Sequence, residues 1–294
     1  MSEDALRDLL PSPAVRFDAN FPARLGRLVA RVAAARERRE GAGSARLFGA
    51  GSEFVGYRPY RPGEDLRQLD WSLFARTRKP FVRVSRREAS EEWALLLDTS
   101  ASMGVGRPGK LQAAAEAAAG LAAVALRLGA GVTLATSSGR VLRARARSSV
   151  APALSFLGSL EARGTLRSEQ IGGPVEQFRS AGRVIVLGDL LELEVSDILN
   201  LRRPGRELQV LQFLAPEELD PASVGAREDS IQWVDPEDGE RVSVAGDPDL
   251  CDAYDEALAK LLEDWGHGLL RHRIAYGVWS SARAFEDVLA AGLF

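Results

Sequence analysis

The sequence predicts an α/β fold in which a doubly wound, mostly parallel sheet is covered by helices on both faces. Short apolar runs of strand length alternate along the chain with longer runs whose apolar residues recur at helical spacing. Two of the strand-like runs are continuous, which is typical of buried strands, and they end in Asp98 and Asp189. Strands that alternate with helices favour parallel pairing, because the helices then serve as the crossovers.

The composition bounds the class of protein. The 294 residues are 46% hydrophobic, which suits one α/β domain with an elaborated end. We expect no membrane span, since no apolar run reaches the roughly 18 residues that a span needs, and the acidic N-terminus does not resemble a signal peptide. Cys251 is the one cysteine, which excludes an internal disulfide and a cysteine-based zinc site and fits a cytoplasmic location.

Charge is spread unevenly along the chain. Residues 53–87 hold nine Arg or Lys and four acids, whereas residues 216–266 hold sixteen acids and three Arg or Lys. Such asymmetry either steers a partner or reflects two solvated faces. The basic stretch carries no nucleic-acid-binding motif, so no nucleic-acid partner is expected.

The first 90 residues predict two segments ahead of the main domain. Residues 1–44 read as a tail followed by an amphipathic helix over 22–39, which begins at a proline and ends at glycines. Residues 45–90 read as a small β-rich subdomain, because prolines and glycines punctuate aromatic residues and short alternating runs. This subdomain serves either as a structural flap or as a surface for a partner.

Residues 91–294 predict the main domain, with a hairpin inserted near 230–244 across the turn Asp238-Gly239. The most strongly helical stretch is the alanine-rich run over 110–128. The elements expected in this domain are strands over 93–97, 132–136, 141–142, 183–189, 208–214 and 272–276, and helices over 110–128, 151–160, 168–178, 197–201, 252–265 and 284–290.

Oxygen-bearing side chains follow the two buried strands. Asp98, Ser100 and Ser102 form the pattern D-x-S-x-S, and Asp189 ends the second strand. Because ligands of an open α/β sheet bind outside the carboxyl ends of its strands, we expect these side chains to meet, together with Thr165 from an intervening loop. Two carboxylates and three hydroxyls suit one hard cation such as Mg²⁺. Each hydroxyl taken alone would equally serve as a helix N-cap.

Two nucleotide-binding patterns compete for the next stretch. Residues 104–109 match G-x-G-x-x-G, but the glycines do not directly follow the strand, and the next strand ends in Thr136-Ser137 without the acid that would bind a ribose. Residues 104–110 match most of G-x-x-x-x-G-K-[ST], but Leu111 replaces the hydroxyl that holds Mg²⁺. A P-loop-like nucleotide-binding protein therefore stays an alternative.

Catalysis has less support than binding. The two histidines, His267 and His272, lie near the C-terminus and away from any nucleophile motif. Metal-assisted hydrolysis normally uses more carboxylates or a metal pair. A single cation held mostly by neutral hydroxyls keeps a strong positive charge, which favours the capture of an outside carboxylate. We predict a non-enzymatic protein, with a metal-dependent hydrolase at the same site as the alternative.

The D-x-S-x-S pattern, with a later threonine and aspartate, resembles the metal-ion-dependent adhesion site of von Willebrand factor A domains. The resemblance implies that Ser100, Ser102 and Thr165 contact the metal and that Asp98 and Asp189 act largely through water. It also implies that an acidic side chain of a partner protein completes the metal's shell. The metal would be Mg²⁺, or alternatively Mn²⁺ or Ca²⁺.

The segment upstream of this domain carries a long motif made of Gly51, Glu53, Phe54, Gly56, Arg58, Tyr60, Pro62, Gly63, Glu64, Asp65, Arg67, Asp70, Trp71, Ala75 and Arg76. This motif resembles the hallmark of the domain of unknown function fifty-eight family, bacterial proteins that carry it just before an adhesion-type domain. The resemblance covers roughly residues 45–290 and includes the acidic turn at 235–240 and the helix around Tyr254. It departs from the family at Glu64, where an aspartate is usual, and many relatives carry N-terminal membrane spans, which we do not expect here.

Members of that family are often encoded beside the MoxR class of AAA+ ATPases. The resemblance therefore implies a cytoplasmic adaptor or co-chaperone that works with such an ATPase in the maturation of protein complexes. We expect some of four arginines in the basic stretch to form the surface that faces a partner. These are Arg58, Arg61, Arg67 and Arg76.

Overall fold

The structure, a computed structural model, describes residues 14–41, 52–59, 73–74, 77–87, 92–166, 171, 176–220, 231–237, 241–244 and 248–292. Its centre is a six-stranded sheet in the order β10-β7-β6-β3-β4-β5, which is parallel except for β5 at one edge. The prediction of a mostly parallel sheet is confirmed. The strands of this sheet are β3 (Glu92–Leu97), β4 (Gly131–Thr136), β5 (Val141–Ala144), β6 (Arg183–Gly188), β7 (Glu207–Leu214) and β10 (Ala275–Ser280).

The strand order reverses beside β3. From β3 the chain moves outward to β4 and β5, and it then places β6 and β7 on the other side of β3. The crevice between β3 and β6 is therefore the switch point of the sheet, where ligands of such folds bind.

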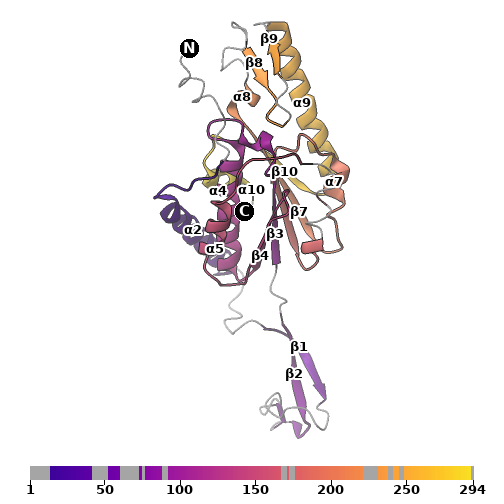
Figure 1. Cartoon of the computed structure of the whole chain (residues 1–294). Coiled ribbons are helices and arrows are strands. Elements are labelled where there is room, and N and C mark those ends of the chain that lie inside the picture. The colour runs from indigo at the N-terminus through magenta and orange to yellow at the C-terminus, as the bar shows by residue number, and fades with distance from the viewer. Residues whose placement is uncertain are drawn as a thin grey trace.

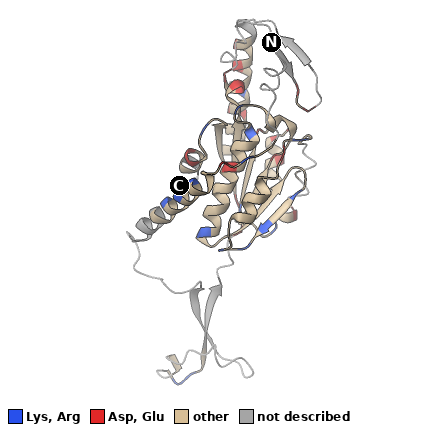
Figure 2. Cartoon of the chain, turned by 60° about the vertical axis from the view of Figure 1, so that its left-hand side comes forward, with Lys and Arg blue, Asp and Glu red and all other residues tan. Residues whose placement is uncertain are grey.

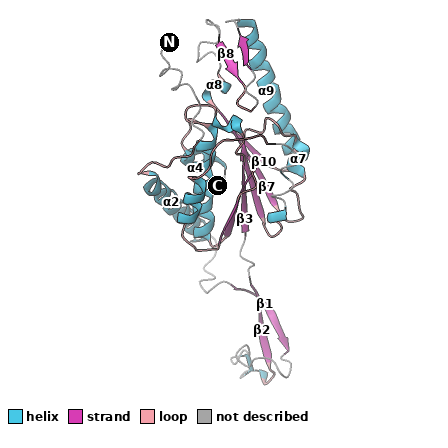
Figure 3. Ribbon diagram, in the orientation of Figure 1, coloured by secondary structure: helices cyan, strands magenta, loops and turns pink. Residues whose placement is uncertain are grey.

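Helices cover both faces of the sheet (Figures 1 and 3). Successive side chains of a strand point to opposite faces, so Leu95 and Leu97 of β3 join one buried cluster, whereas Ala94 and Leu96 join the other. The first cluster includes residues of α2 (Phe21–Gly41), α4 (Lys110–Leu128), α5 (Ala151–Leu157) and α10 (Phe285–Gly292), and the second includes residues of α7 (Val195–Leu199) and α9 (Pro248–Leu270).

Helix α4 is the core helix of the first cluster. Its small side chains allow close packing, and a Cβ added at Gly120 would lie 2.3 Å from a methyl carbon of Leu289 in α10. Contrary to the sequence-based expectation, α4 is long and apolar enough to cross a membrane by length and composition, although 78% of that stretch is buried inside the fold. A buried core helix meets the same criteria, because both need a long apolar run.

The predicted N-terminal helix is α2, and it packs into the main domain. Phe21 lies against Phe285 of α10 with ring centroids 5.1 Å apart. Arg24 donates two hydrogen bonds to the carboxylate of Glu286, at 2.8 and 2.6 Å. The two ends of the described chain are thus held together on one face of the sheet.

Two antiparallel hairpins lie outside the central sheet (Figure 1). The first pairs β1 (Ser52–Pro59) with β2 (Phe81–Arg87), within the segment predicted to be β-rich. The second pairs β8 (Ile231–Val234) with β9 (Arg241–Val244), as predicted. It stands beside α9, beyond the carboxyl edge of the sheet. Acidic residues are prominent along α9 in Figure 2, and those that are exposed are Asp252, Asp255, Glu256, Glu263 and Asp264.

The boundaries of α9 and β10 differ from the prediction. The helix was expected to end at 265, before two glycines, but it continues to Leu270. Within the helix, Gly268 leaves room for the close approach of α7. A Cβ added at this position would lie 2.8 Å from a methyl carbon of Val195. The turn that ends α9 includes a hydrogen bond from the N–H of Ile274 to the carbonyl of Leu269. As a result β10 begins at Ala275, three residues later than predicted.

Candidate metal centre

The two predicted carboxylates meet at the switch point. Asp98 follows β3 and Asp189 follows β6, and the two strands are hydrogen-bonded neighbours. The N–H of Asp98 bonds to the carbonyl of Leu187 at 2.8 Å. Gly188 permits this approach, because a Cβ there would lie 2.7 Å from the Cβ of Asp98. A buried pair of carboxylates at the carboxyl edge is the arrangement that the sequence predicted.

The D-x-S-x-S loop folds its three polar side chains together. Oδ1 of Asp98 accepts a hydrogen bond from the N–H of Ser100 at 2.8 Å. The hydroxyl oxygens of Ser100 and Ser102 lie 2.9 Å apart. Asp98 and Ser100 are buried and Ser102 is half-buried at the start of η2 (Ala101–Gly104). The loop therefore presents one carboxylate and two hydroxyls as a group.

The loop that carries Thr165 runs alongside the D-x-S-x-S loop. The N–H of Ala101 bonds to the carbonyl of Gly164, and the N–H of Arg163 bonds to the carbonyl of Thr99, each at 2.8 Å. Gly164 takes a positive φ of 77°, which a glycine adopts without strain. These contacts bring half-buried Thr165 to the same edge of the sheet as Asp98.

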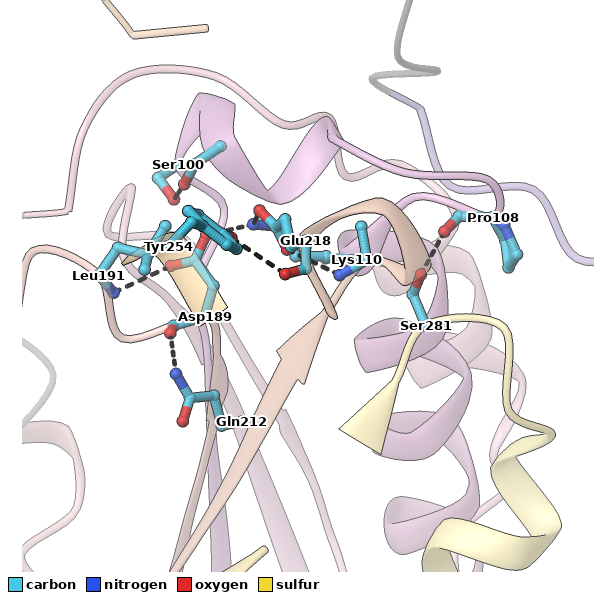
Figure 4. Close-up of polar contacts among 11 residues, drawn as sticks. Ser100, Pro108, Lys110, Asp189, Leu191, Gln212, Glu218, Tyr254 and Ser281 are labelled. Carbon is cyan, nitrogen blue, oxygen red and sulfur yellow. Dashed lines mark hydrogen bonds and ion pairs between the residues drawn. The ribbon is translucent and has the colours of Figure 1, made fainter. Parts of the chain in front are cut away.

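Lys110 is part of the centre and was missed by sequence reasoning. It begins α4, it is fully buried, and its Nζ bonds to Oδ2 of Asp189 at 2.9 Å and to Oε1 of Glu218 at 2.5 Å (Figure 4). Burial acts to lower the pKa of Lys110, but Asp189 and Glu218 outweigh it and raise that pKa. The signal in the sequence was a lysine on the buried face of an alanine-rich helix.

A set of hydrogen bonds fixes this ion pair in place (Figure 4). The side chain of Gln212 donates to the carbonyl of Asp189 at 2.6 Å, and the hydroxyl of Tyr276 donates to the Gln212 amide oxygen. In α8 (Pro216–Leu219), Glu218 accepts from the N–H of Ala215 at 2.7 Å, and its carbonyl accepts from the hydroxyl of Tyr254 at 3.0 Å. The Asp189 side of the centre is therefore rigidly supported.

Within the described ranges, no Lys or Arg forms an ion pair with Asp98 as Lys110 does with Asp189. Burial raises the pKa of Asp98 to about 7, and the charge of Asp189 adds to this effect, whereas Ser100 and Lys110 oppose it. A buried carboxylate is costly to ionise without a compensating positive charge. Its oxygens, next to two hydroxyls, are hard donors of the type that Mg²⁺ binds. The residues present thus fit a divalent cation, although the part of the chain that is described contains no group of three or more His, Cys, Asp or Glu side chains positioned to hold a metal.

The structure does not favour phosphate binding at the glycine-rich stretch 104–110. A P-loop lysine must reach a phosphate, but Lys110 is buried and occupied by two carboxylates. The histidines are also remote from the centre. His267 is exposed on α9, and His272 lies in the turn before β10, at the opposite edge of the sheet.

The predicted partner-facing arginines lie mostly outside what the structure describes. Arg58 falls within β1, of which the backbone is described. Arg61, Arg67 and Arg76 lie outside the described residues.

Comparison with known proteins identifies a protein family and a short region of sequence similarity to three further proteins. The family model described as "Protein of unknown function DUF58" matches residues 56–261. Three uncharacterized proteins, one from Mycobacterium bovis and two from strains of Mycobacterium tuberculosis, are each 43% identical to this chain over 58 residues. Each match covers 20% of this chain and 18% of the relative, so the chain matches less than a fifth of the relatives' length.

Proposed function

Because the chain belongs to the family of proteins of unknown function DUF58, and because its buried D-x-S-x-S loop faces a second strand-end carboxylate, we propose that it is a metal-dependent protein-interaction module. The observation that carries the proposal is the grouping of the Asp98 carboxylate with the hydroxyls of Ser100 and Ser102 at the switch point. The proposal includes a von Willebrand factor A-like fold, which the strand order and the helices on both faces support.

The residues of this chain have distinct tasks in the proposal. Asp98, Ser100, Ser102 and Thr165 hold the cation, and Asp189 balances its charge from the neighbouring strand. Lys110 orients the Asp189 carboxylate through their ion pair at 2.9 Å. A bound Mg²⁺, Mn²⁺ or Ca²⁺ would supply a positive charge that accepts a carboxylate oxygen from a client protein.

The proposed partner is a MoxR-type AAA+ ATPase, with the chain acting as its adaptor in the cytoplasm. Support comes from the match to the DUF58 family, whose model includes the basic segment with Arg58, Arg61, Arg67 and Arg76. We assign the two tasks to different places. The metal centre captures an acidic client, and the basic segment faces the ATPase.

Calorimetric titration with Mg²⁺ and Mn²⁺ tests the metal centre. We expect saturable binding to the wild-type protein and at least a tenfold loss of affinity in Asp98→Ala and Ser100→Ala, because each removes a ligand. Ser148→Ala, which changes an exposed serine away from the centre, is the matched control and should bind as the wild type does. Equal binding by all four proteins would refute the metal centre.

The alternative of a metal-dependent hydrolase is tested with the same samples. Hydrolysis of a generic phosphoester that disappears in Asp98→Ala but survives in Ser148→Ala would favour the enzyme. Saturable ATP binding that requires Lys110 would instead favour the P-loop-like alternative.

A further inference from the structure

A basic cavity lies at the edge of the sheet opposite to the metal centre. It has a volume of about 800 Å³, and it is lined by residues at the start of β6, β7 and β10, together with the loop before β7 and the turn before β10. Arg183 and Glu207, which begin β6 and β7, are paired in register. Because parallel strands begin at one edge and end at the other, roughly 20 Å of sheet separates this cavity from Asp98.

Positive charge dominates the lining of the cavity. Five arginines face a single carboxylate, that of Glu207, so positive charges exceed negative ones by four, although the whole chain has a net charge of −3. In a cleft lined by one sign of charge, the low-dielectric walls focus the field. The cavity is therefore a local attractor for anions. Its arginines are Arg183, Arg202, Arg203, Arg206 and Arg273.

Two of the five arginines build the wall. Arg183 donates to the carboxylate of Glu207 at 2.9 and 2.6 Å, and its guanidinium lies 4.5 Å from the centroid of the Trp93 ring. Arg206 donates to three backbone carbonyls, which carry no net charge to balance its own. Burial lowers the pKa of Arg206, and the charge of Arg203 adds to this effect. The three carbonyls belong to Phe178, Ala181 and Leu201.

A tight turn positions Arg203. The N–H of Arg206 bonds to the carbonyl of Arg203 at 3.1 Å, across Pro204 and Gly205. A proline followed by a glycine with a positive φ, here 76°, is the sequence that a type II turn favours. Arg203 is exposed, and within the described ranges it forms no ion pair. The turn thus holds an unpaired guanidinium on a rigid backbone at the cavity.

Arg273 supplies a second unpaired guanidinium from the turn before β10. It is exposed and forms no ion pair among the residues that the structure describes. Its φ of 58° lies in the left-handed region, which favours glycine. Residues held in such a conformation are concentrated at functional sites. The adjacent His272 has its Nδ1 3.4 Å from the guanidinium of Arg202, which connects this turn to the loop before β7.

We propose that this cavity binds an oligophosphate chain, the chemistry that inorganic tripolyphosphate and nucleoside triphosphates share. Guanidinium groups bind phosphate oxygens through paired, charge-assisted hydrogen bonds. A phosphate chain carries several negative charges on a narrow body, which suits the surplus of four positive charges better than single carboxylates do. The volume lies within the range of roughly 300–1,000 Å³ that small-molecule sites have. The inference goes beyond the proposed function, because it uses no residue of the metal centre.

Calorimetric titration of the full chain with tripolyphosphate and with ATP tests the proposal. A chelating buffer keeps divalent metal from bridging either anion to the metal centre. We expect saturable binding to the wild type and at least about a tenfold loss of affinity in Arg203→Ala and in Arg273→Gly, because each removes a charge-assisted contact. Arg273→Gly also relieves the left-handed backbone, so the urea midpoint should not fall while binding is lost.

Arg271→Ala is the matched control. Arg271 is an exposed arginine two residues from Arg273, and it does not line the cavity. Its affinity for tripolyphosphate should change by less than about twofold, because exposed charges away from the ligand interact with it weakly. Asp98→Ala should bind as the wild type does, so failure of the metal centre and failure of this cavity are separate results.

The two anions distinguish the source of the phosphate chain. Equal affinities support recognition of the chain alone, whereas ATP binding at least about tenfold tighter supports a nucleotide. The proposal is overturned if neither anion binds saturably, or if Arg203→Ala and Arg273→Gly bind as the wild type does. A short oligoglutamate peptide that binds as tightly as tripolyphosphate would also overturn it, in favour of an acidic protein segment.

Discussion

Asp98 and Asp189 end neighbouring strands with the same sequence pattern, but their carboxylates lie in different electrostatic settings. Asp189 has an ammonium at 2.9 Å and a carbonyl fixed by Gln212. Asp98 is contacted by the N–H of Ser100, and the hydroxyl of Ser137 lies 3.5 Å from the same oxygen. Asp189 is thus paired with a positive charge within the fold, whereas no ion pair of Asp98 is formed among the described residues.

This difference separates stability from function. The ion pairs of Lys110 connect α4 to the end of β6 and to α8. Loss of this side chain should therefore lower the stability of the whole domain. Burial makes the charged form of Asp98 costly, as its raised pKa indicates. A site that binds a cation needs such an uncompensated charge, because a fully paired carboxylate has little to gain from a metal.

Removal of the Lys110 ammonium group should have the largest effect on the free energy of unfolding. Lys110→Met leaves the buried Asp189 and the half-buried Glu218 without their cation, which should lower the free energy of unfolding by about 3–5 kcal/mol. Urea denaturation measures this. The double variant Lys110→Met, Asp189→Asn should recover part of the loss, since one of the stranded charges is removed. A loss below about 1 kcal/mol in the single variant would show that the ion pair is not structurally important.

Ionisation of Asp98 should destabilise the fold, whereas the ion pair of Lys110 stabilises it. Its pKa is raised to about 7, so the folded state binds a proton that the unfolded state has released at that pH. The corresponding stability is complete below about pH 4 and is lost as the pH rises through 7. Without metal, the wild type should lose about 2–3 kcal/mol between pH 5 and pH 8 relative to Asp98→Asn. Denaturation in a chelating buffer at both pH values is the measurement.

Added Mg²⁺ sharpens this prediction. It should stabilise the wild type at pH 8 through binding and leave Asp98→Asn nearly unchanged. If the stability of the wild type in the chelating buffer did not depend on pH, the raised pKa of Asp98 would be contradicted.

Gly188→Ala should disturb both carboxylates. The new Cβ would lie 2.7 Å from the Cβ of Asp98, and such overpacking costs about 1–3 kcal/mol. Mg²⁺ affinity should fall as Asp98 is pushed aside, which calorimetry would detect. Gly26→Ala is the matched control, because open space surrounds that position in α2, and it should be neutral or stabilising by up to about 1 kcal/mol.

The smallest effect is expected at the periphery of the Asp189 side. Tyr254→Phe removes the hydroxyl that donates to the carbonyl of Glu218 at 3.0 Å. The cost should be under about 1 kcal/mol, as for a partly exposed hydrogen bond, with metal affinity unchanged. A tenfold change in Mg²⁺ affinity would instead place Tyr254 within the functional network.

Local patterns in the sequence predicted the parts of the molecule that depend on neighbours along the chain. The continuous run before Asp98 predicted a buried central strand, and the Asp238-Gly239 turn predicted the hairpin. The D-x-S-x-S spacing predicted that Ser100 and Ser102 would lie close together, because residues in one tight loop share its geometry.

Pairings across long sequence distances could not be predicted in this way. Lys110 meets partners 79 and 108 residues further along, and no spacing rule connects them. The length of α9 depended on the approach of α7 to Gly268, which is again a tertiary contact.

The packing of α2 against α10 makes the first hairpin an insertion. The chain leaves the body after α2 and returns at β3, and both of these elements contribute to one buried cluster, while β1 and β2 stand apart from it (Figure 1). Replacement of residues 42–91 by a short glycine–serine linker is therefore expected to leave the central sheet and the candidate metal centre in place. Such chimeras would test whether the two proposed tasks, recognition of an ATPase and capture of an acidic client, belong to different parts of the chain.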